Sequence, residues 1–352
     1  MKGKTQMSSL DRAVNVLSLF DGCSMGRLAL ERAAIPVKQY FASEIDKYAI
    51  TIAKKNFPNT IHLGDVTTVR GEDLEPIDLL IGGSPCQGFS FASKDRLNFD
   101  DSRSKLFFEY VRILKEFKPK YFLFENVRMK QECQDIISEY LGVKPIAINS
   151  RLVSAQNRVR LYWTNIPVDM PEDKGIVLKD IIEKENPSFK YYKLKEYYND
   201  KIYNKDGCHQ VGEADIKGYD IIKRVYGIYG KAPALTTMQG GHREPKIACS
   251  DKIHWRKLTP LECERLQTLP DGYTDKGVSN SQRYKMLGNG FTVDVIAHIL
   301  KSILIVNDEI IIDDDPTEIP EQTTMTNLVI EEQEKEEDDS IIEDYHNWGM
   351  HH

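Results

Sequence analysis

The feature that most constrains the fold is a regular alternation of short apolar runs with amphipathic segments over residues 13–164. Apolar runs bounded by turn residues are typical of buried strands, and the amphipathic segments between them are typical of helices. Strands that alternate with helices favour a mostly parallel sheet with helices on both faces. The expected strands are residues 14–20, 39–43, 60–66, 77–81, 121–124, 145–149 and 161–163.

The first three strands are expected to end in residues suited to a nucleoside ligand. The glycine turn 21–26 follows the first strand, and the next two strands lead to Glu44 and Asp65. Glycines allow close approach of a ligand, and a carboxylate about 20 residues after such a turn suits a ribose diol. Asp65 could accept a hydrogen bond from a purine amino group. The turn lacks a GxGxxG pattern, so a dinucleotide is not favoured, and either acid taken alone could simply cap a helix.

The stretch 82–90, GGSPCQGFS, places Cys86 just past the expected strand 77–81. Ligands bind at the carboxyl ends of the strands in open α/β sheets, and a thiolate there can act as a nucleophile. The spacing alone equally permits a small buried cysteine. Glu125 follows a later strand at the same edge. Arg158 and Arg160, two residues apart on an extended segment, are expected to point to one face, in a site or at a solvated edge.

Composition and charge narrow the class of protein. The chain has 352 residues and six cysteines without CxxC spacing, which predicts neither a zinc site nor a disulfide framework. No apolar stretch is long enough to span a bilayer, so we expect no membrane partner and a cytoplasmic location. Residues 307–352 carry 16 acidic side chains and one lysine, and this net charge of −15 leaves +8 on the rest, from a total of −7. A basic body suggests nucleic-acid contact, although ordinary surface charge would look similar.

The chain is expected to form two folded parts between flexible ends. Residues 1–12 form a flexible lead-in, residues 13–164 and 258–306 one α/β domain, residues 165–257 a smaller domain with poor periodicity, and residues 307–352 an acidic, disordered tail. Helices are expected at 27–34, 47–56, 105–117, 131–141, 260–269 and 293–306. The long polar loop 90–104 is expected to be a lid or a binding loop.

These segments, taken in order, resemble the DNA cytosine-5 methyltransferase family, most nearly its animal de novo type and related bacterial and phage enzymes. The resemblance covers nearly all of residues 14–164 and 255–306. It rests on Phe20-Asp21-Gly22 with Gly26, Glu44, Gly64-Asp65-Val66, Pro85-Cys86-Gln87, Glu125-Asn126-Val127, Gln156-Asn157-Arg158-Val159-Arg160 and Gly288-Asn289-Gly290. It implies a Rossmann-like S-adenosylmethionine-dependent fold, with a mostly parallel seven-stranded sheet and a small target-recognition domain.

The resemblance also implies a reaction and its residues. A Cys86 thiolate would attack carbon 6 of a cytosine flipped out of double-stranded DNA, and carbon 5 would then take a methyl group from S-adenosylmethionine. The implied catalytic residues are Cys86, Glu125, Arg158 and Arg160. The implied cofactor-binding residues are Phe20, Asp21, Gly22, Gly26, Glu44, Ile45, Asp65, Val66, Pro85, Leu106 and Asn289. The expected DNA-binding residues are Gln87, Ser90, Lys94, Arg96, Thr237, Gln239, His242 and Arg243, and no metal is expected.

Partners and rival functions follow from the same reasoning. Double-stranded DNA is the expected substrate, a cognate restriction endonuclease a potential partner, and a nucleoid-associated place in a bacterial or phage-infected cell the expected location. The alternatives are an RNA cytosine methyltransferase of the same fold, an inactive DNA-binding scaffold and a nucleotide-dependent oxidoreductase. The chain lacks a Cys-Phe-Thr segment, which argues against the RNA enzyme. It has Cys86, Glu125 and Arg158, which argues against an inactive scaffold. It lacks GxGxxG, which argues against an oxidoreductase.

Overall fold

The computed structural model describes residues 13–84, 105–203 and 207–309. Within these ranges the predicted seven-stranded, mostly parallel sheet is confirmed, in the order β3-β2-β1-β4-β5-β7-β6. Only β7 runs antiparallel to its neighbours, β5 and β6. The strands are β1 (Val14–Leu19), β2 (Val37–Ser43), β3 (Ile61–Gly64), β4 (Leu79–Gly82), β5 (Tyr121–Val127), β6 (Ile146–Asn149) and β7 (Val159–Thr164).

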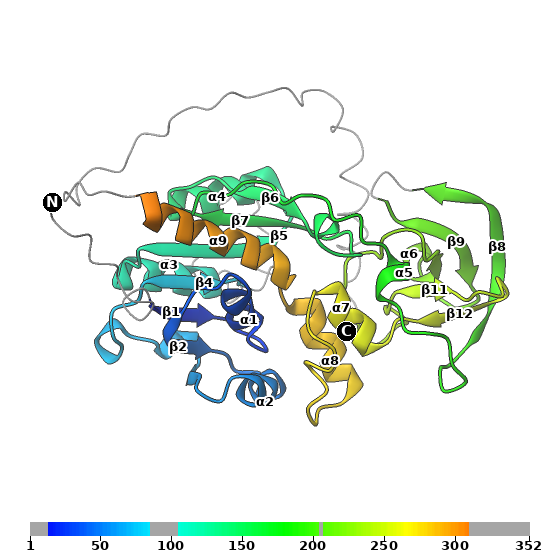
Figure 1. Cartoon of the computed structure of the whole chain (residues 1–352), viewed down its shortest axis with the longest axis horizontal. Helices are drawn as coiled ribbons and strands as arrows, with labels where there is room; N and C mark the ends of the chain where they lie inside the picture. Colours follow the sequence, from blue (N-terminus) through cyan, green and yellow to red (C-terminus); the bar gives the residue numbers. More distant parts are fainter. Residues whose placement is uncertain (1–12, 85–104, 204–206, 310–352) are drawn as a thin grey trace, which may run out of the picture. The chain divides into compact units, whose positions relative to one another are not determined.

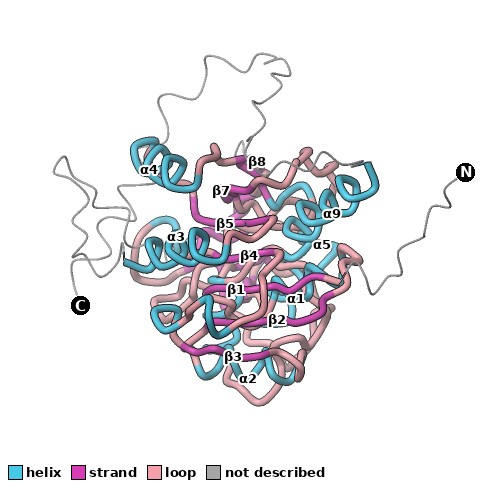
Figure 2. Tube along the Cα trace, turned by 90° about the vertical axis from the view of Figure 1, so that its left-hand side faces the viewer, coloured by secondary structure: helices cyan, strands magenta, loops and turns pink. Residues whose placement is uncertain are grey.

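Helices cover both faces of this sheet because its strands are apolar on both sides. Helices α3 (Lys105–Phe117) and α4 (Gln131–Leu141) lie on one side, and α1 (Met25–Arg32) and α9 (Val293–Glu309) on the other (Figure 2). Alternate residues of β1 show the consequence, since Leu17 packs in the core with α3 and α4, whereas Val16 packs in the core with α1 and α9.

Several helices begin and end where local signals predict. Helix α2 (Lys47–Asn56) is capped by Asp46, whose carboxylate accepts from the backbone amides of Tyr48 and Ala49. Helix α4 ends at Gly142, which has a φ of 72°. Helix α7 (Pro260–Leu266) begins with a capping box between Thr259 and Glu262.

The segment after β7 holds a second substructure, a closed five-stranded barrel (Figure 1). Its core is small, comprising Leu194, Ala214, Val225 and Trp255, and the Trp255 ring stacks on Tyr192 with the centroids 4.5 Å apart. The barrel strands are β8 (Tyr192–Tyr203), β9 (His209–Ala214), β10 (Arg224–Tyr226), β11 (Lys246–Ala248) and β12 (His254–Lys257), and the short helices α5 (Leu178–Ile181) and α6 (Asp220–Lys223) accompany it. Poor periodicity in the sequence did not indicate a barrel.

The segment after the barrel returns to the sheet through three helices, one more than expected. Residues 286–292 look like the start of the final helix, yet Asn280–Asn289 forms a separate helix, α8, and α9 begins only at Val293. A buried ion pair joins the last barrel strand to α7, since Arg256 Nη2 lies 2.7 Å from Glu262 Oε1.

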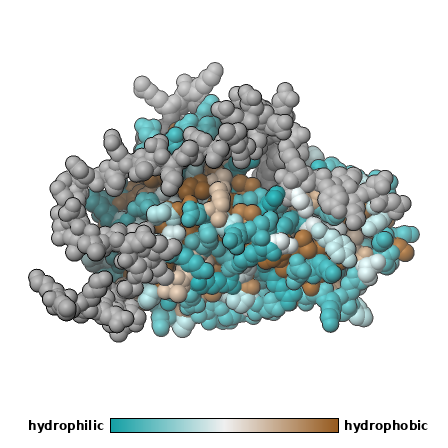
Figure 3. Space-filling view, turned by 45° about the horizontal axis from the view of Figure 1, so that its top comes forward, coloured by the Kyte–Doolittle hydropathy of each residue, from teal (hydrophilic) through white to brown (hydrophobic). Residues whose placement is uncertain are grey.

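The described surface and helices give no sign of a membrane segment. On the face shown in Figure 3, hydrophilic residues predominate and the hydrophobic ones form scattered patches. Among the residues that the structure describes, no helix is both long and apolar enough to cross a bilayer.

Candidate active site

The predicted site residues converge at one edge of the sheet because the strand register requires it. Leu19 at the end of β1 pairs with Ser43 of β2 and with Gly82 of β4, and Gly82 pairs with Phe124 of β5. The residues that follow these four are therefore level with one another. They are Phe20, Glu44, Gly83 and Glu125, which the sequence assigned to the site or its entry loop.

Glu44 fastens the turn after β1 to the start of α2. Its Oε2 accepts from the Gly22 amide at 2.8 Å, and its Oε1 accepts from the amides of Ile45 and Asp46, each at 2.8 Å. Gly22 has a φ of 59° with nothing within 4 Å of where a Cβ would stand, so its backbone is open to a ligand. Phe20 also has a positive φ, 57°, and strained backbone of this kind tends to cluster at functional sites.

The neighbouring surface fits a nucleoside. Ile45, next to Glu44, is 76% exposed, and an apolar side chain that stands in water beside polar groups is typical of a ligand surface. The exposed Asp65 carboxylate caps the short helix Val66–Thr68 by accepting from the amide of Thr67 at 2.9 Å. The Val66 side chain itself is buried. An open glycine turn, a half-buried carboxylate and an exposed apolar side chain are the surfaces that a nucleoside cofactor needs.

Asp21 lies beneath this turn rather than on it. It is only 7% exposed, and its carboxylate accepts from the Tyr40 hydroxyl at 2.7 Å and from the Ser24 hydroxyl at 2.5 Å. Burial raises the pKa of Asp21 to about 6, although both hydroxyls oppose the rise. Through these bonds Asp21 shapes the turn that Gly22 opens.

Glu125 and Arg160 form the polar centre of the edge. Arg160 Nε lies 3.1 Å from Glu125 Oε1 across the antiparallel β5–β7 pair. A Cβ on Gly83 would stand 3.0 Å from Glu125 Oε2, so the segment leading to Cys86 passes directly beside this carboxyl. Burial raises the pKa of Glu125, and the positive charges of Arg160 and Arg158 only partly oppose that rise. Such a carboxyl can carry a proton toward a base.

Asn126, which the sequence analysis quoted without a role, holds the entry to the same segment. Its buried amide donates to the Ser84 carbonyl at 3.3 Å, while its own oxygen accepts from the Val127 amide. The preceding residue, Glu125, therefore faces the site while Asn126 fixes the backbone two residues before Cys86. Cys86 itself lies outside the described residues, as do Pro85, Gln87, Ser90, Lys94 and Arg96.

Arg158 is buried and binds main chain from two distant segments. Its guanidinium donates to the carbonyl of Leu235 at 2.9 Å and to the carbonyls of Gly288 and Gly290 at 3.0 Å each. The solvated-edge interpretation of the arginine pair is therefore wrong. Arg160 contacts Glu125, whereas Arg158 ties the strand to the loop after the barrel strand β10 and to the end of α8.

The glycines of the Gly288-Asn289-Gly290 motif are needed for close packing. A Cβ on Gly288 would stand 2.0 Å from the Thr236 carbonyl oxygen, and one on Gly290 would stand 2.3 Å from the sulfur of Met25. Neither position has room for a side chain. Asn289 between them is exposed, and its backbone position is set by these two contacts.

Two buried glutamines complete this junction, and the sequence signalled only one of them. Gln156 accepts from the Leu235 amide at 2.8 Å and donates to the Leu266 carbonyl and to Gln267. Gln267 in turn donates to the Leu287 carbonyl at 2.6 Å. Gln156 stood in a quoted motif, whereas nothing near Gln267 in the sequence distinguishes it from a helix-terminal residue.

The other residues expected to contact DNA, Thr237, Gln239, His242 and Arg243, lie on the 236–244 loop, between β10 and β11. Gln239 and His242 are exposed at its tip, while Thr237 and Arg243 are half-buried at its sides. Met238 is buried and anchors the loop from within. Thus the loop offers its polar groups to solvent and its apolar residue to the protein.

Two further predicted cofactor residues support the site from beneath. Gly26 lies in the first turn of α1, where a Cβ would stand 3.3 Å from the Tyr40 hydroxyl. Leu106, the second residue of α3, is half-buried and packs against the core. Among the described residues, no cluster of three or more His, Cys, Asp or Glu side chains could hold a metal ion.

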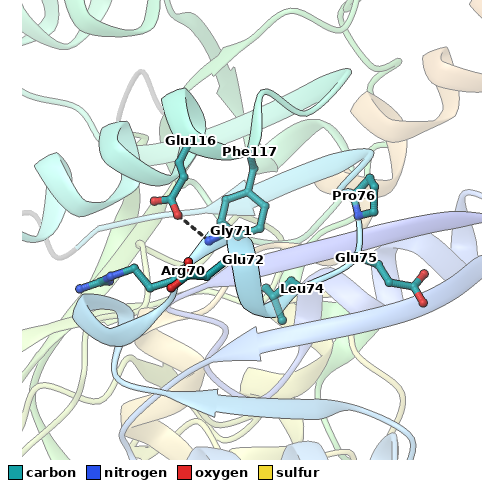
Figure 4. Close-up of a pocket in the computed structure, with 8 residues that line it drawn as sticks. All are labelled: Arg70, Gly71, Glu72, Leu74, Glu75, Pro76, Glu116 and Phe117. Carbon is teal, nitrogen blue, oxygen red and sulfur yellow. Dashed lines mark hydrogen bonds between the residues drawn. The ribbon is translucent and has the colours of Figure 1, made fainter.

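A hollow of about 550 Å³ lies elsewhere and has no evident chemistry (Figure 4). It precedes β4, at the amino end of that strand, where the Gly71 amide donates to Glu116. Arg70, Leu74 and Phe117 also line it, together with Glu72, Glu75 and Pro76. Ligands are expected at the opposite edge of such a sheet.

Several known methyltransferases resemble this chain in sequence or in fold. An orphan methyltransferase of Bacillus phage SPbeta, M.SPBetaI, is 28% identical and aligns with 83% of this chain and 97% of its own length. The type II methyltransferase M1.ScrFI of Lactococcus lactis is 32% identical over 82% of this chain and 77% of its own. The solved structure of the Schizosaccharomyces pombe Dnmt2 methyltransferase has the same fold, with a TM-score of 0.62 at 19% identity over 84% of this chain and 100% of that one.

The family comparison agrees with the geometry of the sheet edge. Residues 14–304 match the C-5 cytosine-specific DNA methylase family, a range that includes the whole sheet, the barrel, α7, α8 and most of α9. The chain therefore belongs to the C-5 cytosine-specific DNA methylase family, the DNA cytosine-5 methyltransferases whose methyl donor is S-adenosylmethionine.

Proposed function

We propose that the protein methylates carbon 5 of a flipped-out cytosine in double-stranded DNA through a transient bond between the Cys86 sulfur and carbon 6 of the base. The observation that carries the proposal is the Glu125–Arg160 pair, 3.1 Å apart, beside the glycine that leads to the Cys86 segment. A nucleophile, a protonatable carboxyl and a cation are the groups that attack on a cytosine ring requires.

Glu125 would act on the pyrimidine edge. Burial raises the pKa of its carboxyl, which favours the protonated form that can donate a hydrogen bond to ring nitrogen 3. That hydrogen bond withdraws electron density from carbon 6 and so favours attack there. Arg160 orients the carboxyl through its 3.1 Å contact and can reach the base oxygen.

The cofactor would lie along the ends of β1 to β3. Gly22 and Glu44 would hold its polar groups and Ile45 would cover its apolar ring, while Asp65 would meet the exocyclic amino group. When bound, S-adenosylmethionine supplies an electrophilic methyl group. The chain's own contribution is to fix the turn by the three amide bonds to Glu44 and to shield the site with Phe20 and Ile45.

The barrel and the 236–244 loop would serve as the target-recognition part. Residues 192–257 carry 13 Lys or Arg against 8 Asp or Glu, a positive balance that favours the phosphate backbone. An arginine such as Arg243 can read guanine in the major groove. Taking a base out of the duplex costs a few kcal/mol, which contacts in the pocket would offset.

The type II methyltransferases among the relatives suggest a cognate restriction endonuclease acting on the same sites as a partner. The bacterial and phage sources of these relatives favour an enzyme that works on DNA in the cytoplasm of a bacterial cell.

A trapping experiment tests the mechanism. Duplex DNA in which 5-fluorocytosine replaces cytosine should give a covalent complex with the wild-type protein and S-adenosylmethionine, because the fluorine cannot leave as the proton does. Cys86→Ser should give none while binding S-adenosylhomocysteine normally. Cys133→Ser, at a buried thiol on α4 that has no predicted role in the reaction, is the control and should trap DNA like the wild type. A complex formed by Cys86→Ser, or preferential methylation of tRNA over duplex DNA, would contradict the proposal.

A further inference from the structure

Two buried lysines bracket the segment that connects β10 to β11. Lys231 and Lys246 are 8% and 2% exposed, and between them lie residues 232–245, which include the 236–244 loop. Lysine is almost never buried unless its ammonium is paired. Each of these ammonium groups is satisfied mainly by backbone carbonyls, which indicates that each fixes a path of the main chain.

The first lysine binds the beginning of the segment to two connections, the one between β6 and β7 and the one that follows β7. Lys231 Nζ donates to the carbonyls of Arg151, Ser154 and Ile176. Four residues later, the Leu235 carbonyl accepts from Arg158. Arg158, one of the predicted catalytic residues, therefore helps to hold the start of the segment.

The second lysine, the first residue of β11, binds the end of the 236–244 loop. Lys246 Nζ donates to the His242 carbonyl at 2.5 Å and to the Glu244 carbonyl at 3.1 Å. The Trp255 ring lies alongside, 5.8 Å from Nζ to the ring centroid. Lys257 binds the Glu244 carboxylate at 2.9 Å and thereby holds the same stretch from its outer side.

The tip between these fixed ends has an unusual backbone. Met238, Gly240, Gly241 and His242 all have a positive φ, between 51° and 77°. For Met and His such a conformation is strained and persists only where the surroundings impose it. The bonds from Lys246 fall on His242 and on Glu244 two residues beyond it, so they act on the strained part of the tip.

We propose that Lys246 is a positioning residue for sequence recognition, whose ammonium keeps the tip of the 236–244 loop in one preformed conformation before DNA arrives. Lys246 is too deeply buried to contact DNA itself, so its effect would pass through the backbone of His242 and Glu244. The inference rests on the proposed role of this loop in target recognition. A preformed tip discriminates between sequences because it cannot adapt to a wrong base pair, whereas a relaxed tip can.

The hydrogen bonds of Lys246 explain why a charged side chain occupies this buried position. Burial lowers the pKa of Lys246 to about 8, the Glu244 carboxylate opposes that shift, and the positive charge of Lys257 adds to it. An apolar side chain would fill the space beside Trp255 without this cost, yet it could not bind two carbonyls. Deprotonation above pH 8 should weaken the same two bonds in the unaltered protein.

The test compares three variants on duplex DNA. Bisulfite sequencing of DNA from cells that express the wild type first defines the methylated sequence, and kcat/KM is then measured on that duplex and on duplexes changed at one base pair. Lys246→Met should lower the ratio of the cognate to the altered value at least tenfold, while its affinity for S-adenosylhomocysteine, measured by calorimetry, stays that of the wild type. Lys246→Arg, which restores a permanent cation, should recover most of the ratio. Lys252→Met, which removes an exposed barrel lysine beside Tyr197, should leave it unchanged.

The wild type supplies an independent readout. Its selectivity ratio should fall between pH 7 and pH 9, whereas that of Lys246→Arg should not, and effects of pH on the thiol or the base cancel in the ratio. A Lys246→Met enzyme that keeps the wild-type ratio, or that loses activity equally on every duplex, would overturn the inference. Absence of DNA methylation by the wild type would instead contradict the proposed function.

Discussion

Replacing Asp21 by Asn should stabilise the protein at neutral pH. The buried Asp21 carboxylate accepts from the hydroxyls of Tyr40 and Ser24. The Ser18 hydroxyl also lowers the pKa of Asp21, and no cation is among the causes of its shift. An asparagine has nearly the same shape and can bond to both hydroxyls, but it carries no charge to desolvate. The prediction concerns stability alone and is independent of the cofactor.

The magnitude follows from the two pKa values. A carboxyl whose pKa rises from 3.8 in the unfolded chain to about 6 in the fold binds a proton more tightly when folded, so stability falls as the pH rises through this window. The full difference corresponds to about 3 kcal/mol at pH 7.5 relative to pH below 3.8. About 1.4 kcal/mol of that accrues between pH 5 and pH 7.5.

Urea unfolding of the wild type and Asp21→Asn at pH 5, 6 and 7.5 measures this term. The variant's gain in free energy of unfolding should be larger by about 1.4 kcal/mol at pH 7.5 than at pH 5, because every other titrating group is common to both proteins. Asp65→Asn is the matched control. Hydrogen bonds from Thr67 lower the pKa of Asp65 below its value of 3.8 in the unfolded chain, so the stability that its charge contributes is already complete at pH 5, and the difference between this variant and the wild type should stay constant from pH 5 to pH 7.5. A gain from Asp21→Asn that does not change with pH would refute the reasoning.

Two further predictions concern packing and the cofactor. Glu262→Ala should lower the free energy of unfolding by about 3–5 kcal/mol in urea titrations, because it leaves Arg256, 2% exposed, without its buried partner. Asp271→Ala, which breaks an exposed ion pair with Arg265, should cost under about 1 kcal/mol. Equal losses in the two variants would contradict this account. Ile45→Ser should weaken calorimetric binding of S-adenosylhomocysteine roughly tenfold, because it removes about 1–2 kcal/mol of apolar burial on binding. Ile61→Ser, at another exposed isoleucine, should bind like the wild type, and an equal effect of both would exclude a specific role for Ile45.

The parts of the fold that local signals specify were predicted closely. Helices α2, α3 and α4 have the predicted bounds, because a proline or glycine follows each carboxyl end within two residues and Asp46 caps the start of α2. Helix α8 was missed because Gly288 and Gly290 resemble helix breakers in sequence, whereas in the fold they permit contact with Thr236 and Met25. The barrel was missed because β10 and β11 have three residues each and pair across a long connection, so no periodic pattern could reveal them.

The candidate site, like the fold, has residues that the sequence predicted and contacts that it could not predict. Glu44 and Glu125 were predicted because each follows or ends an apolar strand, and sheet register alone then brings them to one edge. The partners of Arg158, Lys231 and Lys246 are backbone carbonyls. Any residue can offer such a carbonyl, so only the folded chain reveals these contacts.

The spacing of Gln156, Arg158 and Arg160 now has a physical reason. Alternate residues of an extended segment share a face, yet along this face the contacts change from one residue to the next. Gln156 and Arg158 both bind Leu235, which leads into the 236–244 loop, and Arg160 binds Glu125. These three residues, which lie within the five residues 156–160 that lead into β7, therefore connect the loop proposed to read DNA with the carboxyl proposed to bind the base. A shift of the loop that moved Leu235 would have to break its hydrogen bonds to Gln156 and Arg158. Because Arg160 follows these residues in the same extended segment, the placement of the loop and the orientation of Glu125 are coupled.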